Sequence, residues 1–186
     1  MKIYRLRTDV NKFQSFFLEK EDALSLDELS FNGSHRLETW NDPGFYVMHP
    51  KLIKGNFLGF GDASGALTVD TKALQVLEDL FEMSGELLPF TYKGTAFQVV
   101  NVTNVIDVLD EERTQWFYEK GSSPVERYVF HENRLTETPL FKIPQENSLD
   151  IFAVEGIKDP EDEFKGRVEQ SGLTGLTFEE VWRRDD

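Results

Sequence analysis

The stretch TKALQVLEDLFEMSGELLPFTYKGTAFQVVNV, residues 71–102, predicts a helix followed by a β-hairpin. Over residues 71–83 the apolar side chains recur three and four positions apart, which is the spacing of one helix face. Asp70 or Thr71 is suited to cap the start of this helix, and Gly85 to follow its end. The helix must therefore bury its apolar face.

The second part of the stretch predicts two strands, Leu87 to Tyr92 and Thr95 to Val102, joined by the turn Lys93-Gly94. Pro89 has no N–H group, which suits an edge strand or a bulge. A two-residue turn also sets the register of the strands. It predicts three cross-strand neighbours: Tyr92 with Thr95, Phe90 with Phe97, and Leu88 with Val99.

Weaker patterns predict the elements before residue 71. The alternation from Lys2 to Arg7 predicts a short strand at the start or edge of the domain. Clustered Phe and Leu residues between turn signals predict strands and loops over 10–49. Residues 54–65 are interrupted by glycines, so we expect irregular chain there with a short strand around Phe57 and Leu58.

Further elements are expected after the first hairpin. A second hairpin is predicted from Val125–Phe130 and Arg134–Thr138, with Phe130 opposite Leu135, and short strands at Leu140–Ile143 and Ile151–Val154. Asp159 and Pro160 predict the start of a helix that carries Phe164 and Val168 and ends at Gly172. The capping box Thr177-Phe178-Glu179-Glu180 predicts a last short helix that begins at Val181-Trp182.

The composition favours one folded domain over residues 1–186, of mixed α/β or α+β class. From the predicted hairpins and helices we expect the α+β class, with a mainly antiparallel sheet and a few packed helices. Hydrophobic residues make up 39% of the 186 residues and include 16 Phe, more apolar material than a disordered acidic chain carries. The absence of Cys excludes disulfides, thiolate nucleophiles and cysteine zinc sites. Packing alone must therefore stabilise the fold.

The charge and hydropathy restrict the partners. With 34 acidic and 20 basic residues the net charge is −14, which repels nucleic-acid phosphates. No run of about 18 apolar residues could span a membrane, and no apolar run of about 7–15 residues near the start resembles a signal peptide. We therefore expect no nucleic-acid or membrane partner and a cytoplasmic location.

Motifs for chemistry are absent or incomplete. The loop Gly59–Gly65 lacks the spacing and the Lys of a phosphate-binding loop and carries Asp62, so a surface turn is expected. His35, His49 and His131 match no catalytic or zinc spacing. The acids from Asp159 onward have Phe where a calcium loop needs Gly. We therefore expect no catalytic residue, no cofactor and no metal.

The acidic charge is uneven. Residues 1–93 carry a net charge of −4 and residues 94–186 a net charge of −10. Such a field steers a basic partner, although solubility, or acids favoured in a first helical turn, would explain the same residues. The candidate partner-binding residues form two groups: Asp107, Asp110, Glu111 and Glu112, and Asp159, Glu161, Asp162 and Glu163.

Several apolar and glycine-bearing segments resemble a bacterial family of immunity proteins of polymorphic toxin and type VI effector systems. The similarity covers about residues 55–182 and leaves residues 1–54 as an N-terminal strand and loop extension. It is carried by LEDL at 77–80, GELLP at 85–89, VVNVTNVIDVLD at 99–110, LFKIP at 140–144, IFA at 151–153, FKGRV at 164–168 and GLTGLTFEEVW at 172–182.

The resemblance implies a protein that binds and blocks a cognate toxin by direct contact, without catalysis. It transfers no catalytic residue. Two alternatives remain open. One is a small hydrolase, which needs a pocket where a carboxylate and a His converge. The other is an oligomeric regulatory protein, which needs a self-complementary interface.

Overall fold

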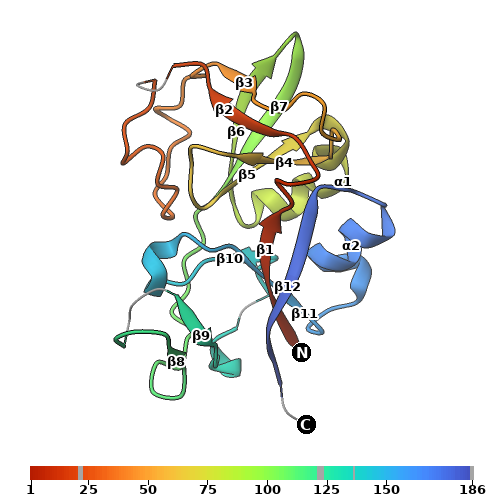
Figure 1. Ribbon diagram of the computed structural model, residues 1–186. Coiled ribbons are helices and arrows are strands. Elements are labelled where there is room, and N and C mark those ends of the chain that lie inside the picture. Colours follow the sequence, from red (N-terminus) through yellow and green to blue (C-terminus); the bar gives the residue numbers. More distant parts are fainter. Residues whose placement is uncertain (21–22, 121–123, 136, 185–186) are drawn as a thin grey trace.

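The computed structural model describes residues 1–20, 23–120, 124–135 and 137–184, and these form an α+β domain with mainly antiparallel sheets, as predicted (Figure 1). The described residues contain a six-stranded sheet, a four-stranded sheet and a two-stranded ribbon. In Figure 1 the six-stranded sheet lies above the four-stranded one, and α1 (Thr71–Glu82) lies where they meet.

The predicted hairpin is present. β6 (Gly85–Tyr92) pairs with β7 (Thr95–Val102), and all three predicted cross-strand pairs are confirmed. Lys93 and Gly94 have φ angles of 49° and 77°, as the left-handed positions of a tight hairpin turn require. Pro89 lies on the outermost strand of its sheet, where a missing N–H breaks no ladder bond.

The predicted helix is also confirmed as α1. Asp70 caps it, because its Oδ1 accepts a 2.9 Å hydrogen bond from the N–H of Ala73. The prediction for Gly85 was wrong, because this glycine begins β6. A Cβ there would lie 2.0 Å from the carbonyl oxygen of Asn101, so close strand pairing requires the glycine.

The six-stranded sheet is antiparallel apart from one parallel contact, between β2 and β4. The glycine-interrupted stretch contributes β4 at the position where a short strand was expected. The strand order is β3 (Phe45–Val47), β2 (Ser15–Leu18), β4 (Phe57–Phe60), β5 (Ala66–Asp70), β7 and β6.

The four-stranded sheet confirms one predicted strand and corrects one predicted helix. Its order is β10 (Leu140–Phe141), β11 (Phe152–Glu155), β1 (Lys2–Thr8) and β12 (Leu176–Arg183). The strand predicted from Lys2 to Arg7 at the start of the domain is confirmed as β1, which is an inner strand of its sheet and not an edge strand. β12 was predicted to be a short helix, but its backbone pairs with β1 over Leu176–Arg183, and tertiary pairing overrides the local capping signal.

The helix expected after Pro160 is interrupted. A 3₁₀ turn (Pro160–Asp162) is followed by Glu163 in extended backbone and only then by α2 (Phe164–Gln170). Asp159 makes no side-chain capping bond.

The second predicted hairpin was wrong in its pairing. β9 (Val125–Arg127) pairs with β8 (Gln115–Trp116), and Phe130 forms a bridge with Leu109 instead of Leu135. Residues 132–134 form a 3₁₀ turn where the hairpin loop and returning strand were expected. Residue 136, in that predicted strand, lies outside the described residues.

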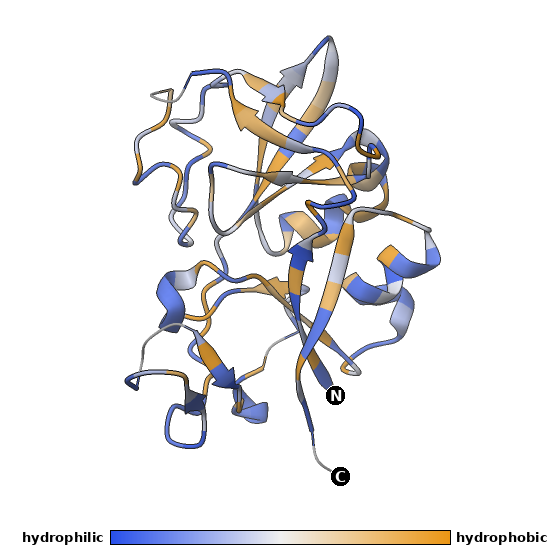
Figure 2. Cartoon of the chain, in the orientation of Figure 1, coloured by the Kyte–Doolittle hydropathy of each residue, from blue (hydrophilic) through white to orange (hydrophobic). Residues whose placement is uncertain are grey.

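The core joins both sheets. Its central cluster contains Leu6 of β1, Phe57 of β4, Leu77 of α1, Val100 of β7 and Phe164 of α2, all buried. Figure 2 shows apolar residues along the strands of both sheets. Within the described ranges, no helix is long and apolar enough to cross a membrane.

Candidate functional site

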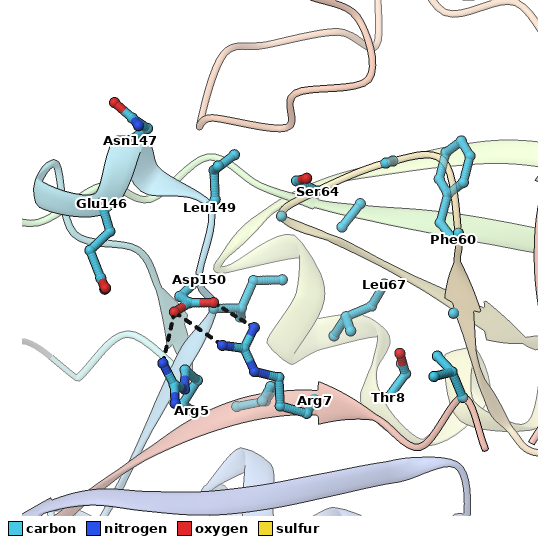
Figure 3. A pocket seen from close by; sticks show the side chains of 18 of the residues that line it. Arg5, Arg7, Thr8, Phe60, Ser64, Leu67, Glu146, Asn147, Leu149 and Asp150 are labelled. Carbon is cyan, nitrogen blue, oxygen red and sulfur yellow. Dashed lines mark hydrogen bonds and ion pairs between the residues drawn. The ribbon is translucent and has the colours of Figure 1, made fainter. Parts of the chain in front are cut away.

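A cleft of about 540 Å³ lies between part of β1 and the glycine-rich loop of the six-stranded sheet (Figure 3). β1 forms one wall, the glycine-rich loop at 59–66 forms another, and residues 146–151 close the third side. No sequence pattern predicted this cleft, since these segments lie far apart along the chain.

Two arginines of β1 meet one carboxylate in this cleft. Arg5 Nη1 lies 3.2 Å and Arg7 Nη1 2.6 Å from the Asp150 carboxylate, as the dashed lines in Figure 3 show. Burial alone would lower the pKa of Arg5, but its bonds to Glu179 and its proximity to Asp150 raise that pKa above its ordinary value. Arg5 is therefore a permanent cation held among carboxylates.

A second buried pair lies beside this network. The hydroxyl of Tyr128 donates a 2.8 Å hydrogen bond to Oε2 of Glu146, and burial raises the pKa of both groups. Glu146, Asn147 and Ser148 have φ angles of 65°, 56° and 56°. Three consecutive left-handed residues that are not glycine store backbone strain beside the cleft.

The glycine loop contributes a wall of the cleft, and its acidic residue points elsewhere. Asp62 accepts a 2.7 Å hydrogen bond from the backbone N–H of Leu18 on β2 and is not a lining residue. A Cβ at Gly61 would lie 2.2 Å from the ring of Phe17, so a larger residue there would displace that ring.

The histidines and carboxylates that come together do so outside the cleft. His131 Nδ1 lies 3.7 Å from Asp110, and His35 Nδ1 lies 2.8 Å from Glu86 on the surface. Over the described ranges, no His lines the cleft and no three His, Asp or Glu residues are grouped to hold a metal ion. The convergence that the hydrolase alternative needs is therefore not found at this cleft.

The first predicted acidic group adjoins β8. Gln145 Nε2 donates to both Asp107 (3.1 Å) and Glu111 (2.8 Å), so these carboxylates lie close together. Asp110 is buried instead. Its carboxylate accepts from the backbone N–H groups of Glu112 and Arg113, and the Arg113 guanidinium lowers the pKa of Asp110.

The second acidic group also divides into surface and interior residues. Asp159, Glu161 and Asp162 are exposed. Glu163 is buried, and its carboxylate accepts hydrogen bonds of 2.8–3.0 Å from three successive backbone N–H groups, those of residues 156–158.

The structure does not bring the two acidic groups together. Figure 1 places the first beside β8 and β9 and the second beside α2, on the other side of the four-stranded sheet. Because Asp110 and Glu163 are buried, only the remaining six acids present a surface to a partner.

The chain after β8 carries a feature that sequence reasoning missed. Phe117 and Tyr118 are 61% and 70% exposed, and their rings meet edge to face with centroids 5.1 Å apart. Three consecutive aromatics, Trp116-Phe117-Tyr118, were the available signal. Residues 107–127 around this aromatic pair contain six acidic and three basic side chains.

Comparisons with protein-family models, with curated proteins and with solved structures found no match to this chain. They therefore add nothing to the resemblance with immunity proteins, and the candidate sites rest on geometry alone.

Proposed function

We propose that this protein is an immunity protein that works in the cytoplasm, where it binds a cognate toxin and blocks it without catalysing a reaction. The resemblance of its sequence to immunity proteins is the reason for proposing a toxin as the partner. The exposed aromatic pair Phe117 and Tyr118 supports binding to a protein.

Exposed aromatic side chains favour a protein interface for a physical reason. Phe and Tyr each bury a large area when a partner covers them, and binding energy concentrates in a few such anchors. A rim of charged residues then selects the partner. Here the rim, formed by residues 107–127 around the aromatic pair, is acidic, so the surface fits a basic face of a toxin.

The direct test is to express this protein together with the toxin encoded by the neighbouring gene. We expect growth to be restored and the two proteins to co-purify. Failure of both results would overturn the proposed function.

The contact surface is tested by Phe117→Ser combined with Tyr118→Ser. Loss of both anchors should weaken binding by about 100-fold, the range of interface hot spots. Tyr46→Ser is the matched control, because Tyr46 is also an exposed aromatic but lies on β3 of the six-stranded sheet. Equal binding by the double variant and the control would exclude this surface.

The acidic rim is tested by Glu112→Lys combined with Glu126→Lys, compared with Glu161→Lys combined with Asp162→Lys beside α2. Charge reversal near the aromatic pair should slow association about tenfold at low salt and have little effect at high salt. A larger effect from the second pair would move the interface to the side of α2.

A further inference from the structure

We infer that the outer edge of β12 is a second contact for the protein partner and takes up an extended basic segment as an added strand. The inference deepens the proposed function and rests on it only in requiring a protein partner. It is carried by the topology of the four-stranded sheet, by the direction of the β12 backbone groups and by charge.

β12 is the long uncovered edge among the described residues. It has eight residues and a neighbour on one side only, β1. The edge strands β10 and β3 have two and three residues. A long open edge presents a row of backbone donors and acceptors to any extended chain.

The other long edge, β6, is covered from within the chain. The Asp42 carboxylate accepts a 2.8 Å hydrogen bond from the backbone N–H of Thr91, and the indole of Trp40 donates one of 2.8 Å to the carbonyl of Pro89. Pro89 itself offers no donor. No comparable contact covers β12 among the residues described.

The register identifies which β12 groups are open. The N–H of Leu6 bonds to Ile151 on the β11 side, so its neighbours Arg5 and Arg7 turn their backbone groups toward β12. There they pair with Glu179 and Thr177. Because backbone groups alternate in direction along a strand, those of Phe178 and Glu180 point away from β1.

The regular part of this edge is short. The pairing shifts between Ile3 and Tyr4 of β1, which makes Val181 the extra residue of a β-bulge. An added strand would therefore pair with Leu176–Glu180 and stop at the bulge.

Charge favours a basic occupant. Glu179 and Glu180 place carboxylates on opposite faces of the strand, with side chains 50% and 35% exposed. Each already binds one arginine, Arg5 or Arg183, but a carboxylate has about four acceptor sites. The chain as a whole carries −14, which attracts a basic segment and opposes pairing with a second copy.

The test uses the ¹⁵N-labelled full chain and the peptide acetyl-Lys-Val-Lys-Val-Lys-amide, with acetyl-Glu-Val-Glu-Val-Glu-amide as the control. The basic peptide should slow amide hydrogen exchange at Phe178 and Glu180 fivefold or more. The amides of Thr177 and Glu179, already bonded to β1, should change little.

Two variants separate the backbone contribution from the side-chain contribution. Glu180→Pro removes an outward N–H while leaving the bonds to β1, and Glu180→Ala keeps that N–H. We expect Glu180→Pro to bind the basic peptide at least fivefold more weakly than Glu180→Ala. Unchanged spectra elsewhere would confirm that both variants fold.

Four results would overturn the inference: no binding of the basic peptide, equal binding of the acidic peptide, equal affinity of the two variants, or protection of Phe178 and Glu180 that appears with protein concentration alone. The last would assign the edge to a second copy. Since the peptide test needs no toxin, its failure leaves the aromatic-pair experiment standing, and the reverse also holds.

Discussion

The ammonium group of Lys142 donates a 2.8 Å hydrogen bond to the carbonyl oxygen of Gly65, 77 positions away in the sequence. It also donates to the carbonyl of Phe31, and the side chain is completely buried. Among the described residues no carboxylate forms an ion pair with it. Burial, with a smaller effect of Arg36, lowers the pKa of Lys142 to about 7.

Stability should therefore rise with pH above neutrality. Between pH 7 and the ordinary lysine pKa of 10.5, the unfolded chain holds a proton on Lys142 that the folded chain has released. The free energy of unfolding should then increase by up to about 1.4 kcal/mol per pH unit from this group. Urea unfolding at pH 7, 8 and 9 measures the slope. Lys142→Met should flatten it, and an equal slope in this variant would contradict the assignment.

Gly65→Ala should be strongly destabilising. Gly65 has a φ of +77°, and a Cβ there would lie 2.4 Å from the carbonyl oxygen of Phe31 and 3.1 Å from Lys142 Nζ. Gly94 also has a φ of +77° but has nothing within 4 Å of a Cβ. Gly94→Ala should therefore cost only the backbone strain of about 1–2 kcal/mol, and Gly65→Ala clearly more. Equal midpoints of thermal unfolding for the two variants would rule out the steric explanation.

Glu163→Ala should lower the free energy of unfolding by about 2–3 kcal/mol, because it leaves three backbone N–H groups at 156–158 without their acceptor. Glu161→Ala, two positions earlier and exposed, should change it by less than about 0.5 kcal/mol. Denaturant titration of both variants is the measurement. A negligible effect of Glu163→Ala would show that water replaces the carboxylate.

Asn147 provides a test of strain beside the cleft. It is exposed and has a φ of 56°, a conformation that glycine adopts without cost. Asn147→Gly should leave stability unchanged or raise it by up to about 1 kcal/mol, whereas Asn147→Ala should lower it by about 1 kcal/mol. Calorimetric melting of the two variants measures which is more stable. A higher stability of Asn147→Ala than of Asn147→Gly would show that the turn is not strained.

Local patterns predicted the elements whose contacts are local. α1 needs its own apolar stripe and the Asp70 cap, and the β6–β7 register follows from the Lys93-Gly94 turn. The predictions failed where a distant partner determines the structure. β12 contains a sound capping box, yet its backbone bonds to β1, about 170 residues away in sequence.

The candidate sites likewise have features that the sequence predicts and features that only tertiary packing determines. The amount and unevenness of negative charge are properties of composition, but which carboxylates face solvent is not. Asp110 and Glu163 turn inward to satisfy backbone N–H groups of their own loops. The exposed pair Phe117 and Tyr118 is adjacent in sequence, but only packing shows that nothing covers it.

The sequence by itself determined the α+β class, the first hairpin with its register, the main helix and the excess of acid in the second half, because each depends on neighbouring residues or on composition. Tertiary structure alone decided that β1 is an inner strand, that β12 has an open edge, and that Arg5, Arg7 and Asp150 share a cleft. Strand partners and buried ion pairs join residues far apart in the chain, and no local spacing encodes that proximity.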